Sequence, residues 1–508
     1  MRSITASDPD GYLQMSAHRV SRLRDILCAS RPGVPMTAWT LLTVLIWPLI
    51  ACTTVQSLES SDVIPEIPGA WSIDEQQGAG ATEIDYASLT AWWHRFDDPL
   101  LGVLVGFALK ENTSIQGAQA ALRQAQALRE AAAASLWPTV SGSASAQRGV
   151  EGGLSTGSSI FLGLDANWAV DVFGARRAGV DVLDANAQAS EASLGDMQVQ
   201  IAAEVALNYI LLRSAIGRSS IAGENLASQE ETLQITLWRQ QAGLTSSLEA
   251  EQARTAVALN KAQLPLLQMS IVQTQNALAV LTGRPPTFLP EILDMQVSGA
   301  AVLRVRDALP MSIPAQVLRQ RADVRAAEYQ VAAALARVGQ ARAQLLPSFT
   351  IGGSLGLRAA TIGALTGSSA GLGSVLASVT LPILDGGALR AQLRAQQGAL
   401  EQAQQMYRAS VLAALKDVED ALVALRGDRL RLASLRIAAE AAGNAALLAR
   451  QRYSSGLIDF QTVLETQRTQ FATQDGAATA SADVSRDHVR LFKALGGGWP
   501  HMLQEDQL

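Results

Sequence analysis

Apolar and polar positions alternate strictly in short stretches of this chain. From Ser159 to Asp171 the even-numbered positions are Ile160, Leu162, Leu164, Ala166, Trp168 and Val170. A period of two is typical of a strand with one apolar face. The pattern is weaker in the preceding segment, at Val140, Gly142, Ala144 and Ala146. Together the two segments predict a β-hairpin at about residues 138–172, with a Gly/Ser-rich turn.

The same alternation returns later in the chain. Its apolar positions are Phe349, Ile351, Gly353 and Leu355, followed by Val375, Ala377, Val379, Leu381 and Ile383. A second hairpin is therefore predicted at about residues 347–384.

A long proline-free segment follows each hairpin, at about residues 174–241 and 387–454. In the second segment Leu393, Leu400, Tyr407, Ala414 and Ala421 recur every seven residues, with Val411, Val418, Leu425 and Leu432 as the partner row. Such heptads predict long helices with a coiled-coil seam. A helix of this length spans on the order of 100 Å. Shorter helices are expected before each hairpin, at 112–135 and 323–346.

Glycines mark the ends of the two long helices. Gly174 and Gly387 stand at the strand-to-helix turns, and Gly243 and Gly456 stand at the far ends. After these far turns, return helices are predicted at 248–281 and 460–495. Adding 213 to a residue number carries Gly174 to Gly387, Arg239 to Arg452 and Gly243 to Gly456, so the chain contains a duplicated unit. The expected repeats are 92–286 and 310–499, with a linker at 287–309 and a C-terminal tail at 500–508.

The N-terminal segment resembles a secretory signal. Basic residues precede an apolar run from Met36 to Ala51, and the run ends in Leu49-Ile-Ala-Cys52, as in a bacterial lipobox. We therefore expect a signal peptide at 1–51, lipidation of Cys52, and a Ser/Pro/Glu-rich tether at 52–91. The start codon stays open between Met1, Met15 and Met36.

Composition excludes several function classes. The net charge of −6 gives no basic footprint for nucleic acid. The four histidines have no metal-ligand spacing, so no metal site is expected. The pattern Gly-x-Ser-x-Gly occurs around Ser155, Ser354 and Ser369, all in Gly/Ser-rich hairpin sequence without the strand-to-helix turn of a nucleophile elbow. We do not expect an enzyme.

The strands are long enough to cross a membrane at a tilt. Four strands cannot close a barrel, and a sheet in lipid must close, so the chain is expected to be an oligomer. Two chains give 8 strands with a filled interior, whereas three give 12 strands with room for water. An ordinary soluble hairpin is the competing interpretation.

Several motifs resemble the TolC/OprM-type outer-membrane efflux proteins, in the lipoprotein branch that serves resistance-nodulation-division (RND) pumps. They are Trp92-Trp…Asp98-Pro99, Leu281-Thr-Gly-Arg-Pro-Pro286, Arg321-Ala-Asp-Val-Arg-Ala-Ala-Glu328, Arg452-Tyr453…Gly456 and Ala494-Leu-Gly-Gly-Gly-Trp499. They run through nearly the whole chain after Cys52. One departure is Ala322, where the family usually has proline.

The resemblance implies the fold and the function. The fold is mainly α with a membrane β-barrel part: a trimeric 12-stranded β-barrel in the outer membrane, continued by a 12-helix periplasmic α-barrel. The function is a passive channel that carries small molecules from an inner-membrane RND pump and a periplasmic adaptor. No cofactor is expected beyond diacylglycerol and palmitate on Cys52.

The resemblance also implies a closed periplasmic end. The implied gate residues are Arg452, Tyr453, Asp459, Gln461, Thr462, Glu465 and Glu249. Among these, Glu249 is a candidate partner of Arg452, and Glu465 occupies a carboxylate-ring position. Solvated charges at a helix end are the competing interpretation.

Two other functions stay open at this point. One is the outer-membrane duct of a type I protein secretion system, and the other is a lipid-anchored coiled-coil surface protein that conducts nothing. The sequence does not identify the cargo, the particular pump and adaptor, or the gate contacts of the closed state.

Overall fold

The structure is a computed structural model that describes residues 91–151, 155–286, 320–367 and 370–497. The predicted signal peptide, Cys52, the linker at 287–309 and the C-terminal tail lie outside the described residues.

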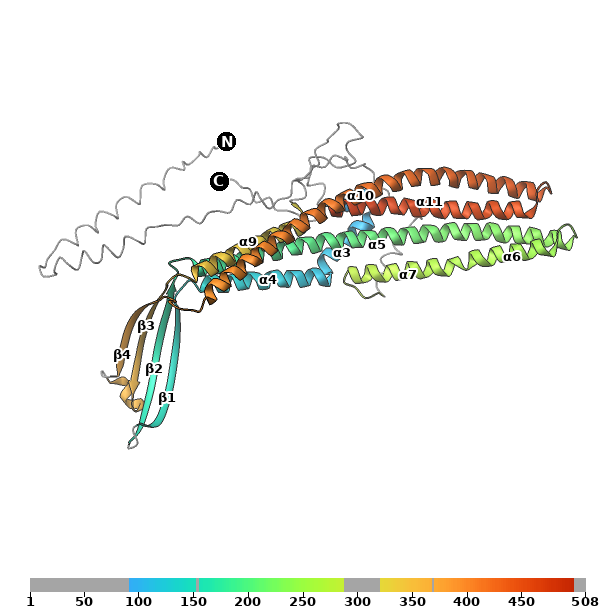
Figure 1. Ribbon diagram of the computed structural model, residues 1–508. Helices are drawn as coiled ribbons and strands as arrows, with labels where there is room; N and C mark the ends of the chain where they lie inside the picture. Colours follow the sequence, from blue (N-terminus) through green and yellow to red (C-terminus); the bar gives the residue numbers. More distant parts are fainter. Residues whose placement is uncertain (1–90, 152–154, 287–319, 368–369, 498–508) are drawn as a thin grey trace, which may run out of the picture. The chain divides into compact units, whose positions relative to one another are not determined.

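Two helices of equal length dominate the described chain. They are α5 (Ala175–Gln241) and α10 (Ala388–Ser454), each of 67 residues (Figure 1). Each begins after a glycine with positive φ, 79° at Gly174 and 86° at Gly387. Only glycine adopts this left-handed conformation at little cost, so the chain turns sharply from strand into helix at these positions.

The backbone N–H groups that begin these helices bond to aspartate side chains. Asp171 accepts hydrogen bonds from the N–H groups of Arg176 and Arg177. Asp385 accepts from the N–H groups of Gly387 and Leu389, at 2.9 and 2.8 Å. These bonds hold the pKa of Asp385 below its usual range, so the carboxylate stays charged where the helix dipole favours it.

Shorter helices complete the helical part. They are η4 (Trp92–Phe96), α3 (Pro99–Glu111), α4 (Thr113–Ala134), α6 (Ser247–Lys261), α7 (Gln263–Leu281), α9 (Ala322–Ala343) and α11 (Phe460–Ala494). Helix α3 was not predicted. Asn112 separates it from α4, because its side chain accepts from the N–H groups of Ser114 and Ile115 and caps the second helix.

The return helix of the first repeat is broken, although the sequence predicted one helix at 248–281. It consists of α6 and α7, separated at Ala262. The break has a local cause in Pro265, which lacks an N–H group and whose ring clashes with the carbonyl of Lys261, four residues earlier. The matching helix of the second repeat, α11, is continuous over 35 residues.

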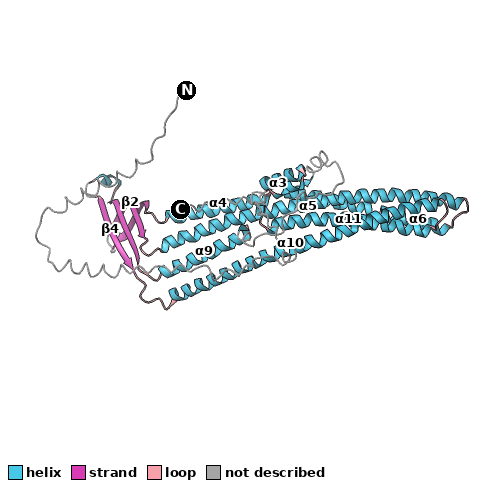
Figure 2. Cartoon of the chain, turned by 90° about the horizontal axis from the view of Figure 1, so that it is seen from above, coloured by secondary structure: helices cyan, strands magenta, loops and turns pink. Residues whose placement is uncertain are grey.

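The strands form one antiparallel sheet in the order β1–β2–β3–β4 (Figure 1), which lies at one end of the helices (Figure 2). They are β1 (Thr139–Glu151), β2 (Ser155–Val170), β3 (Ser348–Ala359) and β4 (Gly371–Thr380). A short helix, η7 (Ile362–Thr366), lies in the connection between β3 and β4. Leu381 and Ile383, which the alternation included, follow the end of β4.

The strand registers place the predicted apolar positions on one face of the sheet. Leu164 pairs with Gly142 on one side and with Leu355 on the other, and Leu355 pairs with Gly373. Directly paired residues share a face. No described residue covers this apolar face, on which Leu355 is 69% and Val375 85% exposed.

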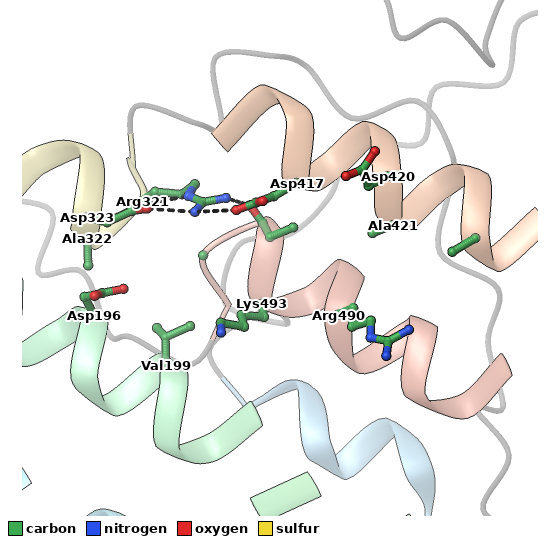
Figure 3. A pocket seen from close by; sticks show the side chains of 13 residues that line it. Asp196, Val199, Arg321, Ala322, Asp323, Asp417, Asp420, Ala421, Arg490 and Lys493 are labelled. Atoms are coloured by element: carbon green, nitrogen blue, oxygen red, sulfur yellow. Dashed lines mark hydrogen bonds and ion pairs between the residues drawn. The ribbon is translucent and has the colours of Figure 1, made fainter. Parts of the chain in front are cut away.

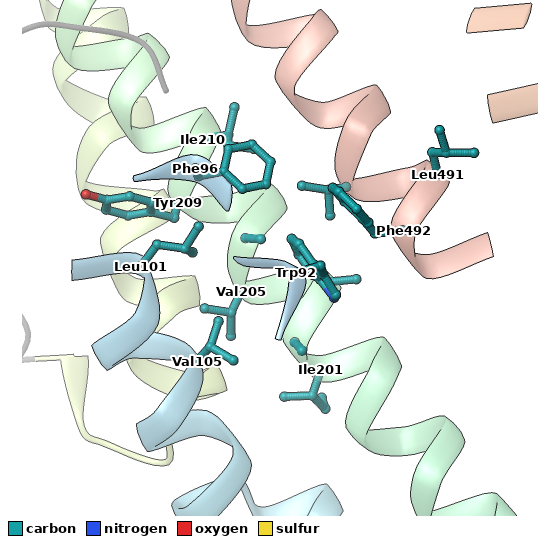
Figure 4. Close-up of a cluster of buried hydrophobic side chains, with 14 of the residues drawn as sticks. Trp92, Phe96, Leu101, Val105, Ile201, Val205, Tyr209, Ile210, Leu491 and Phe492 are labelled. Carbon is teal, nitrogen blue, oxygen red and sulfur yellow. The ribbon is translucent and has the colours of Figure 1, made fainter. Parts of the chain in front are cut away.

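The main hydrophobic core lies where the two repeats meet (Figure 4). Trp92, from the start of the first repeat, stacks on Phe492 of α11, with ring centroids 5.3 Å apart and planes 12° from parallel. Tyr209 of α5 is fully buried and donates to a carboxylate oxygen of Asp98 at 2.9 Å. The core therefore joins η4, α5 and α11.

The heptad seam predicted in α10 is largely buried. From Tyr407 to Leu432 both rows are buried, whereas Leu393 and Leu400 are half-buried. Part of α5 is apolar enough to cross a membrane by length and composition, but 67% of that stretch is buried inside the structure. This burial is typical of a core helix.

A group of charged residues joins α10 to α11 near the core. Asp487 is fully buried, and Arg490 donates to one of its carboxylate oxygens at 2.9 Å. Burial and the neighbouring Asp428 raise the pKa of Asp487 to about 6. Burial, with Arg429 alongside, lowers the pKa of the adjacent His488 to about 4.

The apolar face predicts an asymmetric response to charge. Leu164→Lys places an ammonium in the middle of β2 on the apolar face, whereas Asn167→Lys places it on the polar face of the same strand. If the apolar face meets lipid, Leu164→Lys should destabilise membrane insertion by about 2–4 kcal/mol, and Asn167→Lys should cost little. Folding into lipid vesicles across a urea series measures the difference, and equal effects of both variants would contradict a lipid-facing apolar surface.

The buried carboxyl predicts a stability that depends on pH. The pKa of Asp487 is higher in the folded state than in the unfolded state. The stabilisation that its protonated carboxyl gives the folded state is therefore fully present below about pH 4 and is lost as pH rises through 6. Asp487→Asn mimics the neutral carboxyl, so its stability relative to the parent should rise from pH 5 to pH 8, by about 1–3 kcal/mol per chain. Thermal unfolding at both pH values tests this, with Asp420→Asn on the exposed side of α10 as control. A shift of equal size at both pH values would contradict the prediction.

Candidate functional site

The sheet has a polar face opposite the apolar one. Hydroxyl groups pair across β3 and β4 on this face, with Thr350 and Ser378 at 2.5 Å and Ser354 and Ser374 at 2.8 Å between their oxygens. Hydroxyl pairs of this kind are readily wetted. One side of the sheet therefore suits lipid and the other suits water.

The outer strands of the sheet each have a neighbour on one side only. β1 pairs with β2 and β4 pairs with β3, so the other edges of β1 and β4 have no partner strand among the described residues. A sheet in lipid needs every edge paired. The site is therefore incomplete in a single chain.

Exposed apolar residues on α10 also lack a partner within the chain. Val423, Leu430 and Ile437 recur every seven residues and are 58%, 65% and 71% exposed. A heptad row of this kind normally packs on another helix. Among the described helices none covers it, which fits contact with another chain.

The two helix turns far from the sheet lie close together (Figure 1). Gly243 and Gly456, predicted at these turns, have φ of 72° and 74°. Asp459 begins α11 as its N-cap and accepts from the N–H of Thr462 at 2.9 Å, and the bonds from Thr462 lower its pKa.

Tyr453 links the two turns within one chain. Its side chain is 4% exposed and lies beside Phe460, with ring centroids 5.8 Å apart. Arg239 of α5 places its guanidinium 4.6 Å from the centre of the Tyr453 ring and donates to the Tyr453 carbonyl at 2.6 Å. The Tyr453 hydroxyl lies 3.5 Å from Thr236 Oγ1, at the limit of a hydrogen bond. Arg239 therefore makes the stronger connection.

The other predicted gate residues are mostly on the surface. Gln461, Thr462 and Glu465 are exposed along one side of α11, and Arg452 is exposed at the end of α10. Glu249 accepts a hydrogen bond from the Thr245 hydroxyl. Within the described chain no hydrogen bond or ion pair joins Arg452 to Glu249, its candidate partner from the sequence.

Polar contacts connect α5 to α10 and α11 along the half near the turns. The participating α5 residues stand seven apart, at Arg218, Asn225, Thr232 and Arg239. Their partners, in the same order, are Asp475, Gln474, Gln467 and Tyr453. We call these contacts the polar seam. The side of α5 that faces the second repeat is thus largely polar in this half.

A charged cavity of about 390 Å³ lies near the ends of α9 and α11 (Figure 3). Its central residue is Arg321, which donates to Asp323, to Asp417 and, at 2.9 Å, to the carbonyl of Ala494. Burial by itself lowers the pKa of Arg321, but these two carboxylates raise it above its usual value. Arg321 therefore stays charged and fastens the start of α9 to the end of α11.

One Gly-x-Ser-x-Gly serine of the sequence lies inside the sheet. Ser354, one of the Gly-x-Ser-x-Gly serines, lies within β3 and bonds across to Ser374, so it is not at a strand-to-helix turn. No three His, Cys, Asp or Glu side chains of the described ranges are grouped as metal ligands.

Sequence reasoning missed Arg239, Arg321 and the polar seam as contact residues. Arg239 was noted only as a repeat equivalent of Arg452, and Arg321 only as part of a motif. The seven-residue spacing of the polar seam was the one available signal, because it falls in register with a coiled-coil row.

A family profile for outer membrane efflux proteins matches the chain twice, at residues 104–284 and 313–497. The chain is 32% identical over 471 residues to the pyoverdine export outer membrane protein OpmQ of Pseudomonas putida, covering 89% of this chain and 95% of that one. It is 30% identical over 462 residues to the nodulation protein T of Rhizobium leguminosarum bv. viciae, covering 90% and 93%.

Solved structures agree with these matches. The outer-membrane channel OprN superimposes with a TM-score of 0.78 at 34% identity, covering 86% of this chain and 98% of that one. CusC, at 24% identity and a TM-score of 0.75, shows the same fold. The fold is the helical barrel with a β-barrel of this family, as expected. The chain belongs to the outer membrane efflux protein family, and it is an efflux channel of the outer membrane.

Proposed function

We propose that three copies of the chain form the continuous duct of a tripartite pump, joined to a periplasmic adaptor and an inner-membrane RND transporter. The observation that carries this proposal is the four-stranded sheet with one apolar face, one polar face and two unpartnered edges. Three such sheets give 12 strands, which leave room for water inside. The exposed row on α10 supplies a surface for packing between copies.

The helices set the reach of the duct. Each 67-residue helix carries the chain about 100 Å from the strands to the far turns. That length suits a passage through the periplasm to partners at the inner membrane. Efflux that persists after deletion of both partners would contradict a passive duct.

The proposed cargo is small organic molecules. Relatives of the chain are described as exporting pyoverdine, or as outer membrane proteins of toluene and solvent efflux pumps. Protein secretion stays the alternative for cargo, and failure to conduct ions in a bilayer would favour the non-conducting surface protein.

We propose that the turns at Gly243 and Gly456 close the duct. The link from Arg239 to Tyr453 holds the second hairpin against the first within each chain, and Arg452 is exposed toward a neighbouring copy. Glu249 is the proposed partner of Arg452 across that interface. Gln461, Thr462 and Glu465 are proposed to line the closed end, with Asp459 fixing the start of their helix.

The polar seam supports opening at this end. Hydrogen bonds of Asn225 or Thr232 can be exchanged for water at a small net cost when the helices part. Separating the apolar core around Trp92 would instead expose buried surface to water. Opening is therefore expected to affect the half of the helices near the turns, while the core stays packed.

The gate proposal predicts graded changes in conductance. Arg239→Ala removes a charged hydrogen bond and the ring contact in all three chains, each on the order of 1–3 kcal/mol, so resting conductance should rise roughly tenfold or more. Arg452→Ala should also raise it, whereas Tyr453→Phe should have a small effect, because the hydroxyl bond is long. Glu465→Ala should reduce cation selectivity, because three carboxylates at the entrance attract cations.

Planar bilayers with the purified trimer measure these changes. Arg254→Ala is the matched control, since Arg254 lies on α6 near the same end and, among the described residues, pairs with Glu251 of its own helix. Unchanged conductance and selectivity in the gate variants, with normal trimer yield, would place the gate elsewhere.

We propose that Cys52 carries diacylglycerol and palmitate and begins the mature chain. The lipobox supports this, and a relative from Salmonella typhimurium, SilC, is described as a probable outer membrane lipoprotein. Two lipid groups anchor a protein stably to a membrane, whereas a single acyl chain gives only marginal membrane binding. Mass spectrometry of the mature protein should find the lipids on Cys52, and Cys52→Ala should leave an unlipidated precursor. An unmodified Cys52 in mature protein would disprove the anchor.

A further inference from the structure

The two hairpins of the sheet have equivalent registers. In the first hairpin Thr139 pairs with Asn167, and in the second Ser348 pairs with Thr380. These pairs are related by a shift of 209 positions from β1 to β3 and of 213 positions from β2 to β4. The same two shifts relate every β3–β4 pair to a β1–β2 pair. β3 is therefore the counterpart of β1, and β4 is the counterpart of β2, in register as well as in order.

β2 is longer than its pairing with β1 requires. Its last three residues, Trp168, Ala169 and Val170, lie beyond Asn167, the last residue that pairs with β1. They pair only with β3, where Val170 lies opposite Phe349. A strand needs a neighbour to bond its backbone groups, so β2 continues to Val170 because β3 lies beside it there.

The counterparts of these three residues have no such neighbour in the chain. The shift of 213 carries them to Leu381, Pro382 and Ile383, which follow the end of β4 at Thr380. Leu381 and Ile383 continue the apolar alternation of β4, and they are 51% and 91% exposed. Pro382 suits a segment with a neighbour on one side only, because its nitrogen can face the other side. This segment therefore has the sequence of a strand without the partner that a strand requires.

We propose that β4 of one copy pairs with β1 of the next copy in the register that β2 and β3 adopt within the chain, and that β4 then extends to Ile383. Applying the two shifts to the β2–β3 register places Val379 opposite Ala144 of the next copy, and Ile383 opposite Val140. The inference rests on the proposed function, because the closed barrel supplies the neighbouring β1. It specifies which residues meet at the junction and why β4 ends early in a single chain.

The apolar side chains that meet in this register are complementary in size. Val379 lies opposite Ala144, and Leu381 lies opposite Gly142, so each larger residue of β4 meets a small residue of β1. Val379 is 63% exposed in the single chain. Opposed side chains in a sheet cover one another, so pairing buries apolar surface on the face that is proposed to meet lipid.

The polar side chains of the junction are also compatible. The register places Thr380 opposite Ser143 of the next copy, and Ser378 opposite Ser145. Cross-strand hydroxyl pairs of this kind already join β3 to β4 within the chain. The polar face therefore continues from one copy to the next without a change in its chemistry.

Engineered disulfides between copies test the register. Val379→Cys with Ala144→Cys places the cysteines opposite each other, with Cα atoms about 4.5–5.5 Å apart, which a disulfide spans. Within one chain these positions lie on opposite edges of the sheet (Figure 1), about 14 Å apart across three strand spacings, so they cannot bridge. Oxidation of the full-length trimer in lipid nanodiscs should therefore yield a covalent trimer on a non-reducing denaturing gel.

Slipped cysteine pairs are the matched controls. Val379→Cys with Gly142→Cys or with Ala146→Cys keeps both cysteines on the apolar face but two positions out of register, with Cα atoms about 7–8 Å apart. These pairs should give at least threefold less covalent product after the same oxidation time. The parent protein measures the background from Cys28 and Cys52. Each variant must elute as the normal trimer on gel filtration before oxidation.

Val140→Cys with Ile383→Cys tests the extension of β4. Hydrogen-bonded and non-hydrogen-bonded pairs alternate along a ladder, and this pair is four positions from Val379–Ala144, so both pairs are of the same kind. The covalent yields of the two pairs should therefore agree within about twofold. Cross-linking of Val379–Ala144 without cross-linking of Val140–Ile383 would overturn the extension, because β4 would then end at Thr380 in the trimer as well.

The outcomes distinguish the register from the duct. More covalent product from a slipped pair than from Val379–Ala144 would overturn the register and leave the closed barrel standing. Covalent products larger than a trimer from Val379–Ala144 would support the register and contradict closure by three copies. No disulfide between copies in any of the pairs would overturn both, because β4 and β1 of neighbouring copies would then not be adjacent.

Discussion

The pairing requirement of strand edges in lipid governs the rest of this molecule. A backbone N–H or C=O group without a partner in hydrocarbon costs several kcal/mol, and β1 and β4 each present a whole row of such groups. No rearrangement of the four described strands removes both edges, because four strands are too few to close on themselves. Association between copies is therefore a condition of membrane insertion, and the exposed apolar row on α10 gives the helices a matching reason to associate. When the strands of several copies close into a barrel, their edges are paired and the polar face is enclosed. The pairing of strand edges therefore also produces a water-filled passage.

The helical part divides into two regions with different energetics. Around Trp92, Tyr209 and Phe492 the helices bury large side chains completely, and separation would expose them to water. Nearer the turns the buried positions of α5 include Asn225, Thr232 and Thr236. Asn225 and Thr232 form hydrogen bonds with the second repeat, and Thr236 donates one within its own helix. Hydrogen bonds exchange with water at little net cost, so the polar seam resists separation less than the core does. A smaller apolar cluster around Tyr453, Phe460 and Val463 still holds the turns together. The helices can therefore stay packed around the apolar core and still move apart near the turns.

The strands and the long helices could be predicted because their causes are local. The alternation of apolar and polar residues predicted which side chains share a face of the sheet. Gly174 and Gly387 indicated the sharp turns from strand into helix. Pro265 in the sequence also indicated the break between α6 and α7, but the prediction of one continuous helix did not take it into account. Contacts between distant segments could not be read in the same way. Arg239 stacks on Tyr453 across 214 residues of chain, and Arg321 reaches the carbonyl of Ala494 across 173, because packing of the repeats brings these groups together.

Duplication explains why the two tip arginines differ. Arg239 and Arg452 occupy the same position in their repeats, one turn before the glycine that ends each long helix. In the second repeat the next residue is Tyr453, and its ring offers Arg239 a buried face to stack on. In the first repeat the equivalent residue is Gln240, which offers Arg452 no such ring. One arginine is consequently fixed inside the chain while the other stays exposed at the surface. The tyrosine at this one position therefore distinguishes two equivalent cations, of which one holds the hairpins of a chain together and the other is exposed at the surface.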